Sequence, residues 1–243
     1  MAKRFNSASR IYSVLMKLDA DKYQRIQPVD FWAEILGVMQ KNSSRKAAEV
    51  TNKLSMLHDE LDIVKTAMEE TDFSEYLYND ALKNLEQVIS VLYLQTNWQS
   101  VAQFLKPEAL LALNFCSEIL PDEIQQFNQS DIDELVSLLE ALKKELNASQ
   151  LPEKLVKLIQ KHIAIIEQAI VDYQIQGYRA VENAVTLMTG DIVTQGQMIK
   201  ANNDKPVVAI LGRLYEKVSN VGEKVRPMID MFNSIAGFIE NVT

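Results

Sequence analysis

Three side chains in this sequence belong to the types that most often carry chemistry, namely His58, His162 and Cys116. His58 opens the segment HDELD, in which Asp62 follows four residues later, so a helix would present both side chains on one face. An imidazole and a carboxylate are metal ligands, but two ligands alone do not form a metal site. We interpret the segment as a solvated acidic face of a helix.

His162 and Cys116 both stand in apolar surroundings. The neighbours of His162 at helical spacing are Leu158, Ile159, Ile163 and Ile166. This pattern favours a hydrogen-bonded histidine at the edge of a core over a catalytic base. Cys116 has no cationic neighbour in the segment LNFCSEIL, and a thiol needs such a neighbour to become reactive. We expect it to be a small buried hydrophobic residue.

The sequence contains none of the short motifs that bind phosphates, dinucleotides or zinc, and neither a nucleophile elbow nor a C-x-x-C pair. Helical bundles often hold di-iron sites through Glu-x-x-His pairs, but here Ser55 and Ile159 stand three residues before the two histidines. We therefore predict a protein with no cofactor, no metal and no enzymatic activity. The alternative is an enzyme whose site is assembled from scattered carboxylates and tyrosines.

Glycine is scarce, since the chain has seven and none lies between Gly37 and Gly177. Tight hairpins and phosphate-binding loops rely on glycine, so a segment of this length without one favours helices joined by polar turns. Apolar residues recur at steps of three and four almost throughout, and strand-like alternation is rare. The predicted fold is all-α, a multi-helix bundle of eight to ten helices.

Prolines and capping residues indicate where helices begin: Pro28, Asn42, Pro107, Ser130 with Asp133 as a capping box, and Pro152. We predict one bundle over residues 1–188, with two lobes that meet near 97–106 as an alternative. The segment 189–206, TGDIVTQGQMIKANNDKP, holds two glycines, an Asn-Asn-Asp run and a proline, and we interpret it as a linker. A short helical turn around 192–200 is the other interpretation of its first part.

The most regular feature is a heptad pattern over residues 207–243, which predicts a long amphipathic C-terminal helix of coiled-coil type. We expect its apolar seam to form a partner interface through Leu211, Leu214, Val218, Val221, Val225, Met228, Phe232, Ile235 and Ile239. Pro227 falls away from this seam, where a bend lets the helix follow the surface on which it packs. The seam has three interpretations: packing on the chain's own bundle, pairing with another copy or another protein, or lying on a membrane.

The net charge is −8, so phosphate backbones are repelled and we expect no nucleic-acid partner. Positive charge concentrates in residues 1–18, which carry Lys3, Arg4, Arg10 and Lys17 and no acid. This amphipathic segment is a packed first helix, an attachment to a membrane or a partner, or a cleaved presequence. No apolar run in the sequence approaches the roughly 20 residues that a membrane-spanning helix needs.

These observations favour a non-enzymatic helical interaction protein of a regulatory, accessory or toxin-neutralising type. It would bind a protein partner, or a second copy of itself, through amphipathic helix surfaces. The single cysteine cannot close an intrachain disulfide, and we expect a reducing, cytoplasmic setting. The alternative is a membrane-associated protein that uses the basic N-terminal helix and the amphipathic C-terminal helix.

Overall fold

The computed structural model describes residues 4–123 and 126–219, which form eleven α-helices and two short 3-10 helices with no β-strand. Nine of the α-helices have seven or more residues, and the all-α prediction is confirmed. The chain divides into two compact units. Unit 1 contains Met1–Glu123 and Gln174–Gly177, and unit 2 contains Ile124–Tyr173 and Tyr178–Thr243.

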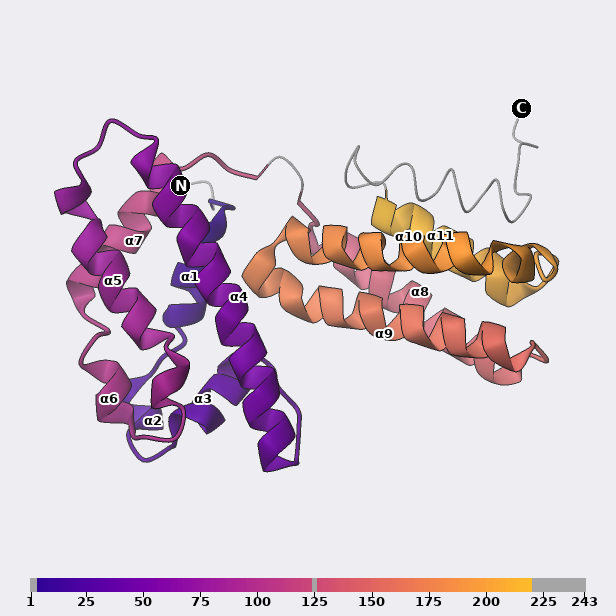
Figure 1. The fold of residues 1–243 in the computed structure, drawn as a ribbon, viewed down its shortest axis with the longest axis horizontal. Coiled ribbons are helices and arrows are strands. Elements are labelled where there is room, and N and C mark those ends of the chain that lie inside the picture. The colour runs from indigo at the N-terminus through magenta and orange to yellow at the C-terminus, as the bar shows by residue number, and fades with distance from the viewer. Residues whose placement is uncertain (1–3, 124–125, 220–243) are drawn as a thin grey trace. The chain divides into compact units, whose positions relative to one another are not determined.

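Unit 1 is built around its longest helix, α4, which has 27 residues. Its elements in chain order are α1 (Ser7–Leu15), α2 (Ala20–Tyr23), α3 (Pro28–Ile35), α4 (Ser43–Glu69), η1 (Glu75–Leu77), α5 (Asn79–Val88), η2 (Val91–Tyr93), α6 (Trp98–Ala102) and α7 (Pro107–Ile119). Helices α1 and α5 each pack against both α4 and α7, and α3 packs against α4 (Figure 1).

Helix starts in unit 1 follow from the residues that the sequence singles out. Asn42 caps α4 by accepting a backbone N–H with its side-chain oxygen, and Pro28 and Pro107 occupy the first turns of α3 and α7. Asn6 caps α1, and its Nδ2 also donates to the carbonyl of Ser117 at 3.0 Å. This second hydrogen bond fixes the start of α1 against the end of α7.

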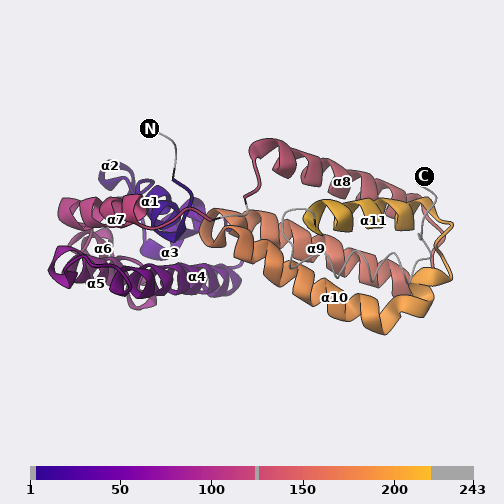
Figure 2. The same ribbon diagram turned by 90° about the horizontal axis from the view of Figure 1, so that it is seen from above.

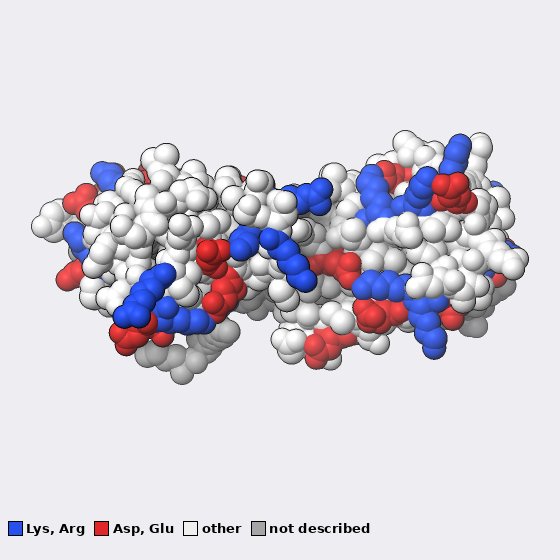
Figure 3. Space-filling view, turned by 90° about the horizontal axis from the view of Figure 1, so that it is seen from below, with Lys and Arg blue, Asp and Glu red and all other residues white. Residues whose placement is uncertain are grey.

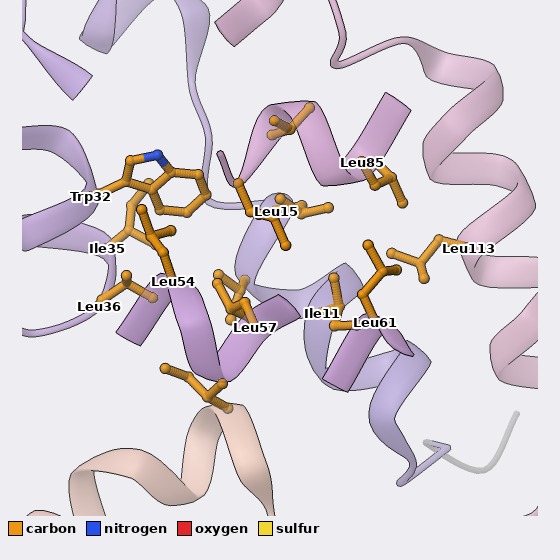
Figure 4. Packing of buried hydrophobic residues seen from close by; sticks show 14 of the residues in the cluster. Ile11, Leu15, Trp32, Ile35, Leu36, Leu54, Leu57, Leu61, Leu85 and Leu113 are labelled. Atoms are coloured by element: carbon orange, nitrogen blue, oxygen red, sulfur yellow. The ribbon is translucent and has the colours of Figure 1, made fainter. Parts of the chain in front are cut away.

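The core of unit 1 is a cluster of buried side chains from several helices, to which α4 contributes leucines at helical spacing. Figure 4 shows Leu54, Leu57 and Leu61 of α4 with Ile11 and Leu15 of α1, Leu85 of α5 and Leu113 of α7, and each of these is at most 1% exposed. Burial of so many aliphatic side chains stabilises the unit by about 1.5–3 kcal/mol for each one, before the cost in entropy. The apolar face of the cationic first helix therefore packs inside unit 1. This agrees with the first of the three interpretations of this segment, a packed first helix.

The described part of unit 2 contains four helices, α8 (Gln129–Ala148), α9 (Glu153–Gln176), α10 (Tyr178–Lys200) and α11 (Pro206–Ser219), and the end of α9 from Gln174 belongs to unit 1. Helices α9 and α10 lie side by side, and α11 packs against α8 and α10 (Figures 1 and 2). The capping box of α8 lies two residues before the predicted one. Asn128 and Asp131 each accept the other's backbone N–H at 3.0 Å, so they, rather than Ser130 and Asp133, satisfy the free donors at this end.

The structure differs from the predicted linker, because α10 continues to Lys200 and only residues 201–205 are non-helical. Gly190 and Gly196 lie inside this helix, and Ile192 and Ile199 are fully buried. Burial of the apolar stripe outweighs the roughly 1 kcal/mol by which glycine disfavours a helix interior. A helix therefore fills most of the segment.

The division of the chain also falls elsewhere than the sequence analysis places it. Residues 97–106 contain α6 inside unit 1, and the boundary follows Glu123. The reason is that α7 packs on α1 and α5, which keeps the chain after residue 106 in the first core. None of the described helices combines the length and apolar character that a transmembrane span requires.

Candidate functional site

Unit 1 buries an ion cluster around the guanidinium of Arg10. Its Nη2 lies 2.6 Å from Oε2 of Glu60, its Nη1 lies 2.7 Å from Oε1 of Glu123, and its Nε donates to the carbonyl of Ile175 at 2.8 Å. The side chains of Arg10 and Glu60 are only 5% and 0% exposed. These charges compensate one another inside the unit, which gives the cluster a structural role.

Gly177 closes this cluster from the side of the chain that follows α9. Its φ of +57° is a left-handed conformation that residues with a side chain rarely adopt. A Cβ at this position would lie 2.6 Å from both Arg10 Nη1 and Glu123 Oε2. Glycine is therefore required here by the backbone and by the ion cluster together.

Unit 2 contains a second buried polar group, centred on His162 of α9. Its Nδ1 contacts the hydroxyl of Tyr215 on α11, and its Nε2 lies 3.1 Å from Oδ2 of Asp191 on α10. Lys161 lies 2.6 Å from the same oxygen of Asp191. The imidazole and the phenol are both 0% exposed. One histidine thus joins three of the four helices described in unit 2.

The protonation of this group follows from burial. Burial lowers the pKa of His162, although its hydrogen bond to Asp191 opposes the shift. A neutral imidazole with Nε2–H donating to the carboxylate leaves Nδ1 to accept the Tyr215 hydroxyl. Burial also opposes the ionised form of Asp191, but Lys161 and His162 bring its pKa below the ordinary value. Both ring nitrogens are occupied, so His162 is a satisfied core histidine as the sequence analysis interprets it.

The other side chains that the sequence nominates for chemistry are separate from one another. His58 is half-buried, while Asp62 is exposed and lies 3.3 Å from Lys65. Glu60 faces inward, so the HDELD segment is solvated only in part. Cys116 is fully buried, and burial raises the pKa of its thiol to about 11. Among the described residues, no three His, Cys, Asp or Glu side chains gather to hold a metal ion.

The first part of the C-terminal seam is covered by the chain itself. Leu211 and Leu214 are 0% exposed and Val218 is 2% exposed, in the helix that packs on α8. Lys217 beside them lies 2.9 Å from Asp131 of α8. Six further residues of the predicted interface, Val221, Val225, Met228, Phe232, Ile235 and Ile239, lie outside the described residues.

A different surface of unit 1 exposes large apolar side chains. The turn between α4 and α5 and the outer face of α7 present the exposed Phe73, Tyr76, Leu77 and Leu111 and the half-buried Phe115, together with the acids Glu69, Glu70, Asp72, Glu75 and Glu108. We call this set the acidic–aromatic surface. Tyr76 is 91%, Leu111 70% and Leu77 54% exposed, whereas side chains of these types are usually covered in part.

The acidic–aromatic surface contains a groove of about 460 Å³. Leu77 of η1 forms one wall, and Glu108, Leu111, Ala112 and Phe115 of α7 form the other. At its margin the ring of Phe73 meets Phe115 edge to face, with centroids 5.4 Å apart. This aromatic contact fixes the turn against α7, so both walls belong to ordered elements of the same unit.

Carboxylates belong to both walls of the groove, since Glu108 lines it and Glu75 stands two residues before Leu77. Burial raises the pKa of Tyr78, directly behind the turn, and the carboxylates of Glu75 and Glu69 raise it further. The two lysines that flank the turn in sequence are already paired, Lys65 with Glu86 and Lys83 with Asp80. The surface therefore combines apolar contact area with an acidic rim.

Three comparisons, with protein-family models, curated proteins and solved structures, find no match for this chain. Its function has to be inferred from the arrangement of its own residues.

Sequence reasoning misses the acidic–aromatic surface, because Asp72 and Ser74 look like ordinary helix-capping residues. The signal that could have indicated it is the segment DFSEYL, a turn that contains two acids and three aromatic or aliphatic residues. Asp191 and Tyr215 are missed for another reason. They are 29 and 53 residues from His162 in sequence, and helical periodicity contains no information about such contacts.

Proposed function

We propose that this chain is a non-enzymatic interaction protein that binds a protein partner through the acidic–aromatic surface of unit 1. The observation that carries the proposal is the groove between Leu77 and Leu111, together with the almost fully exposed Tyr76, which directly precedes Leu77 in sequence. Exposed tyrosine and leucine side chains around a concave apolar site are typical of the residues that dominate binding energy at protein interfaces.

The titratable groups support a binding role over a catalytic one. His162 has both ring nitrogens occupied, Cys116 is buried with a raised pKa, and Arg10 is held by two carboxylates. A general base or nucleophile needs a free, accessible atom within hydrogen-bonding reach of a substrate. None of these three side chains presents such an atom.

The charge distribution supports a protein partner over nucleic acid. On the face drawn in Figure 3, lysine and arginine side chains are interspersed with aspartate and glutamate and form no continuous basic field. The acidic–aromatic surface would repel phosphates directly. A regulatory, accessory or toxin-neutralising role in the cytoplasm fits such a protein, and a buried free cysteine fits a reducing setting.

Differential affinity capture tests the proposal. The tagged full-length chain is compared with Leu111→Glu and with the matched control Leu187→Glu, which adds the same charge at an exposed leucine of α10 in unit 2. We expect a partner that the parent chain and Leu187→Glu retain equally, that Leu111→Glu loses, and that binds again when both components are purified. Equal recovery of every protein by both variants would contradict the proposal.

A further inference from the structure

We infer that the occupant of the groove is a cationic amphipathic helix supplied by the partner protein. This inference rests on the proposed function and specifies the chemistry of the partner. Two features of the described residues carry it: the charge of the turn and the spacing of side chains on α7.

The charge of the turn calls for a positive partner. Residues 66–82 contain five carboxylates and no lysine or arginine, and all five are exposed. Of these, Asp80 pairs with Lys83, while within the described part of the chain no ion pair neutralises Glu69, Glu70, Asp72 or Glu75. Glu108 adds a further carboxylate at the α7 wall, and Lys106 is the basic residue nearest to it in sequence. Lysines or arginines on the partner would complement this rim and steer its approach.

The spacing on α7 matches a helix that lies along it. Glu108, Leu111, Ala112 and Phe115 stand at i, i+3, i+4 and i+7, so they form one stripe over two turns, about 10 Å long. A partner helix with apolar residues at the same spacing would place its side chains between those of Leu111 and Phe115 and against Leu77. The exposed ring of Tyr76 would then cover the partner's flank.

Other occupants fit these residues less well. An added β-strand needs a sheet edge, and the described residues contain no strand. An anionic membrane or a nucleic acid would meet the acidic rim and be repelled. A second copy of this chain, paired symmetrically through the same surface, would bring the acidic rims of the two copies together, with Asp72, Glu75 and Glu108 on each side.

Fluorescence anisotropy with defined peptides tests the inference on the full-length chain. The probe is a labelled leucine–lysine peptide of about 18 residues, or roughly five helical turns, with its leucines on one face. A leucine–glutamate peptide of the same pattern and a scrambled leucine–lysine peptide are the controls. We expect the amphipathic cationic peptide to bind at least about tenfold tighter than either control.

The variants separate groove binding from simple charge attraction. Leu111→Glu makes the protein more acidic, so non-specific attraction of a cationic peptide would stay equal or strengthen. Insertion of apolar side chains into the groove predicts instead a loss of about tenfold or more. Leu187→Glu adds the same charge elsewhere and should bind as the parent chain does. Tyr76→Ala, at a position that is 91% exposed, should also weaken binding without affecting the fold.

Several outcomes would overturn the inference. It fails if Leu111→Glu binds the peptide as tightly as Leu187→Glu, or if the leucine–glutamate peptide binds equally well. It also fails if the chain binds anionic vesicles or self-associates in a way that Leu111→Glu abolishes, because another occupant then fills the groove. If differential capture finds a partner at this surface while the peptide does not bind, the proposed function stands and the helical occupant is wrong. If the peptide binds the groove but capture finds no partner that depends on it, the proposed function is wrong instead.

Discussion

The hydroxyl of Tyr215 on α11 donates to Nδ1 of His162 on α9, and both side chains are fully buried in unit 2. The carboxylate of Asp191 on α10 accepts a hydrogen bond from the other ring nitrogen, Nε2. A polar group of this kind stabilises a core only when each member has its partner, because an unpaired buried atom loses its hydration without compensation. The histidine therefore ties α9, α10 and α11 together, and its stability contribution can be measured.

Tyr215→Phe removes only the hydroxyl and leaves Nδ1 of His162 buried without a donor. We expect the free energy of unfolding of unit 2 to fall by about 1–3 kcal/mol. Urea titration followed by circular dichroism measures the change. The matched control is Tyr76→Phe, where the ring is 91% exposed and the change should stay within about 0.5 kcal/mol. Equal effects of the two substitutions would show that the hydrogen bond contributes nothing.

The same histidine predicts a dependence of stability on pH. Burial lowers the pKa of His162 below its ordinary value of 6.5, so the folded chain holds it neutral while the unfolded chain protonates it. The unfolded state then binds more protons, and the stability due to His162 is complete above pH 6.5 and lost as the pH falls through the folded pKa. Urea titrations at about pH 7.5 and 5.5 should show a smaller loss in His162→Gln than in the parent chain. Identical losses would remove His162 as the cause.

Gly177→Ala should destabilise unit 1, because the new methyl group meets the ion cluster of Arg10 and Glu123 at 2.6 Å in a left-handed backbone conformation. Strain of this kind costs about 1–3 kcal/mol, and displacement of the buried guanidinium adds to it. The control is Gly190→Ala in α10, where a Cβ would meet nothing within 4 Å. That change should instead stabilise the chain by about 0.5–1 kcal/mol. Thermal unfolding of the two variants should shift in opposite directions, and shifts of the same sign would contradict this account.

Leu211→Ala tests the role of the described part of the C-terminal helix. The side chain is 0% exposed in the core of unit 2, so its truncation should lower the free energy of unfolding in urea by about 2–5 kcal/mol. Leu187→Ala, at a leucine that is 61% exposed, should change stability by less than about 1 kcal/mol. If Leu211→Ala left stability unchanged, Leu211 would not belong to the core of unit 2. For the same reason, removal of α11 is a poor test of partner binding, since it would also uncover α8.

The sequence predicts the elements of this fold better than their contacts. Pro28, Asn42 and Pro107 mark helix starts because capping is a local property of a few residues. Gly190 and Gly196 wrongly indicate a linker, because the contacts that keep α10 helical come from other elements of the chain. There, tertiary packing outweighs the low helix propensity of glycine.

The candidate site shows the same limit. Glu60 belongs to an acidic segment and would be expected in solvent, yet it pairs with Arg10, 50 residues earlier in the chain. The groove needs Leu77 and Leu111 on two elements that only the fold brings together. Composition and periodicity correctly predict the all-α class, but no local pattern identifies which exposed side chains share a surface.

The most direct measurement is site-specific photocrosslinking in the cell of origin, with a photoreactive amino acid at position 76 and, as the control, at position 187. Both positions are exposed; position 76 directly precedes Leu77, which lines the groove, whereas position 187 belongs to unit 2. The account predicts a discrete crosslinked species at position 76 that Leu111→Glu abolishes and that position 187 does not give. Absence of any crosslink at position 76, or the same species from both positions, would contradict the claim that this surface binds a protein partner.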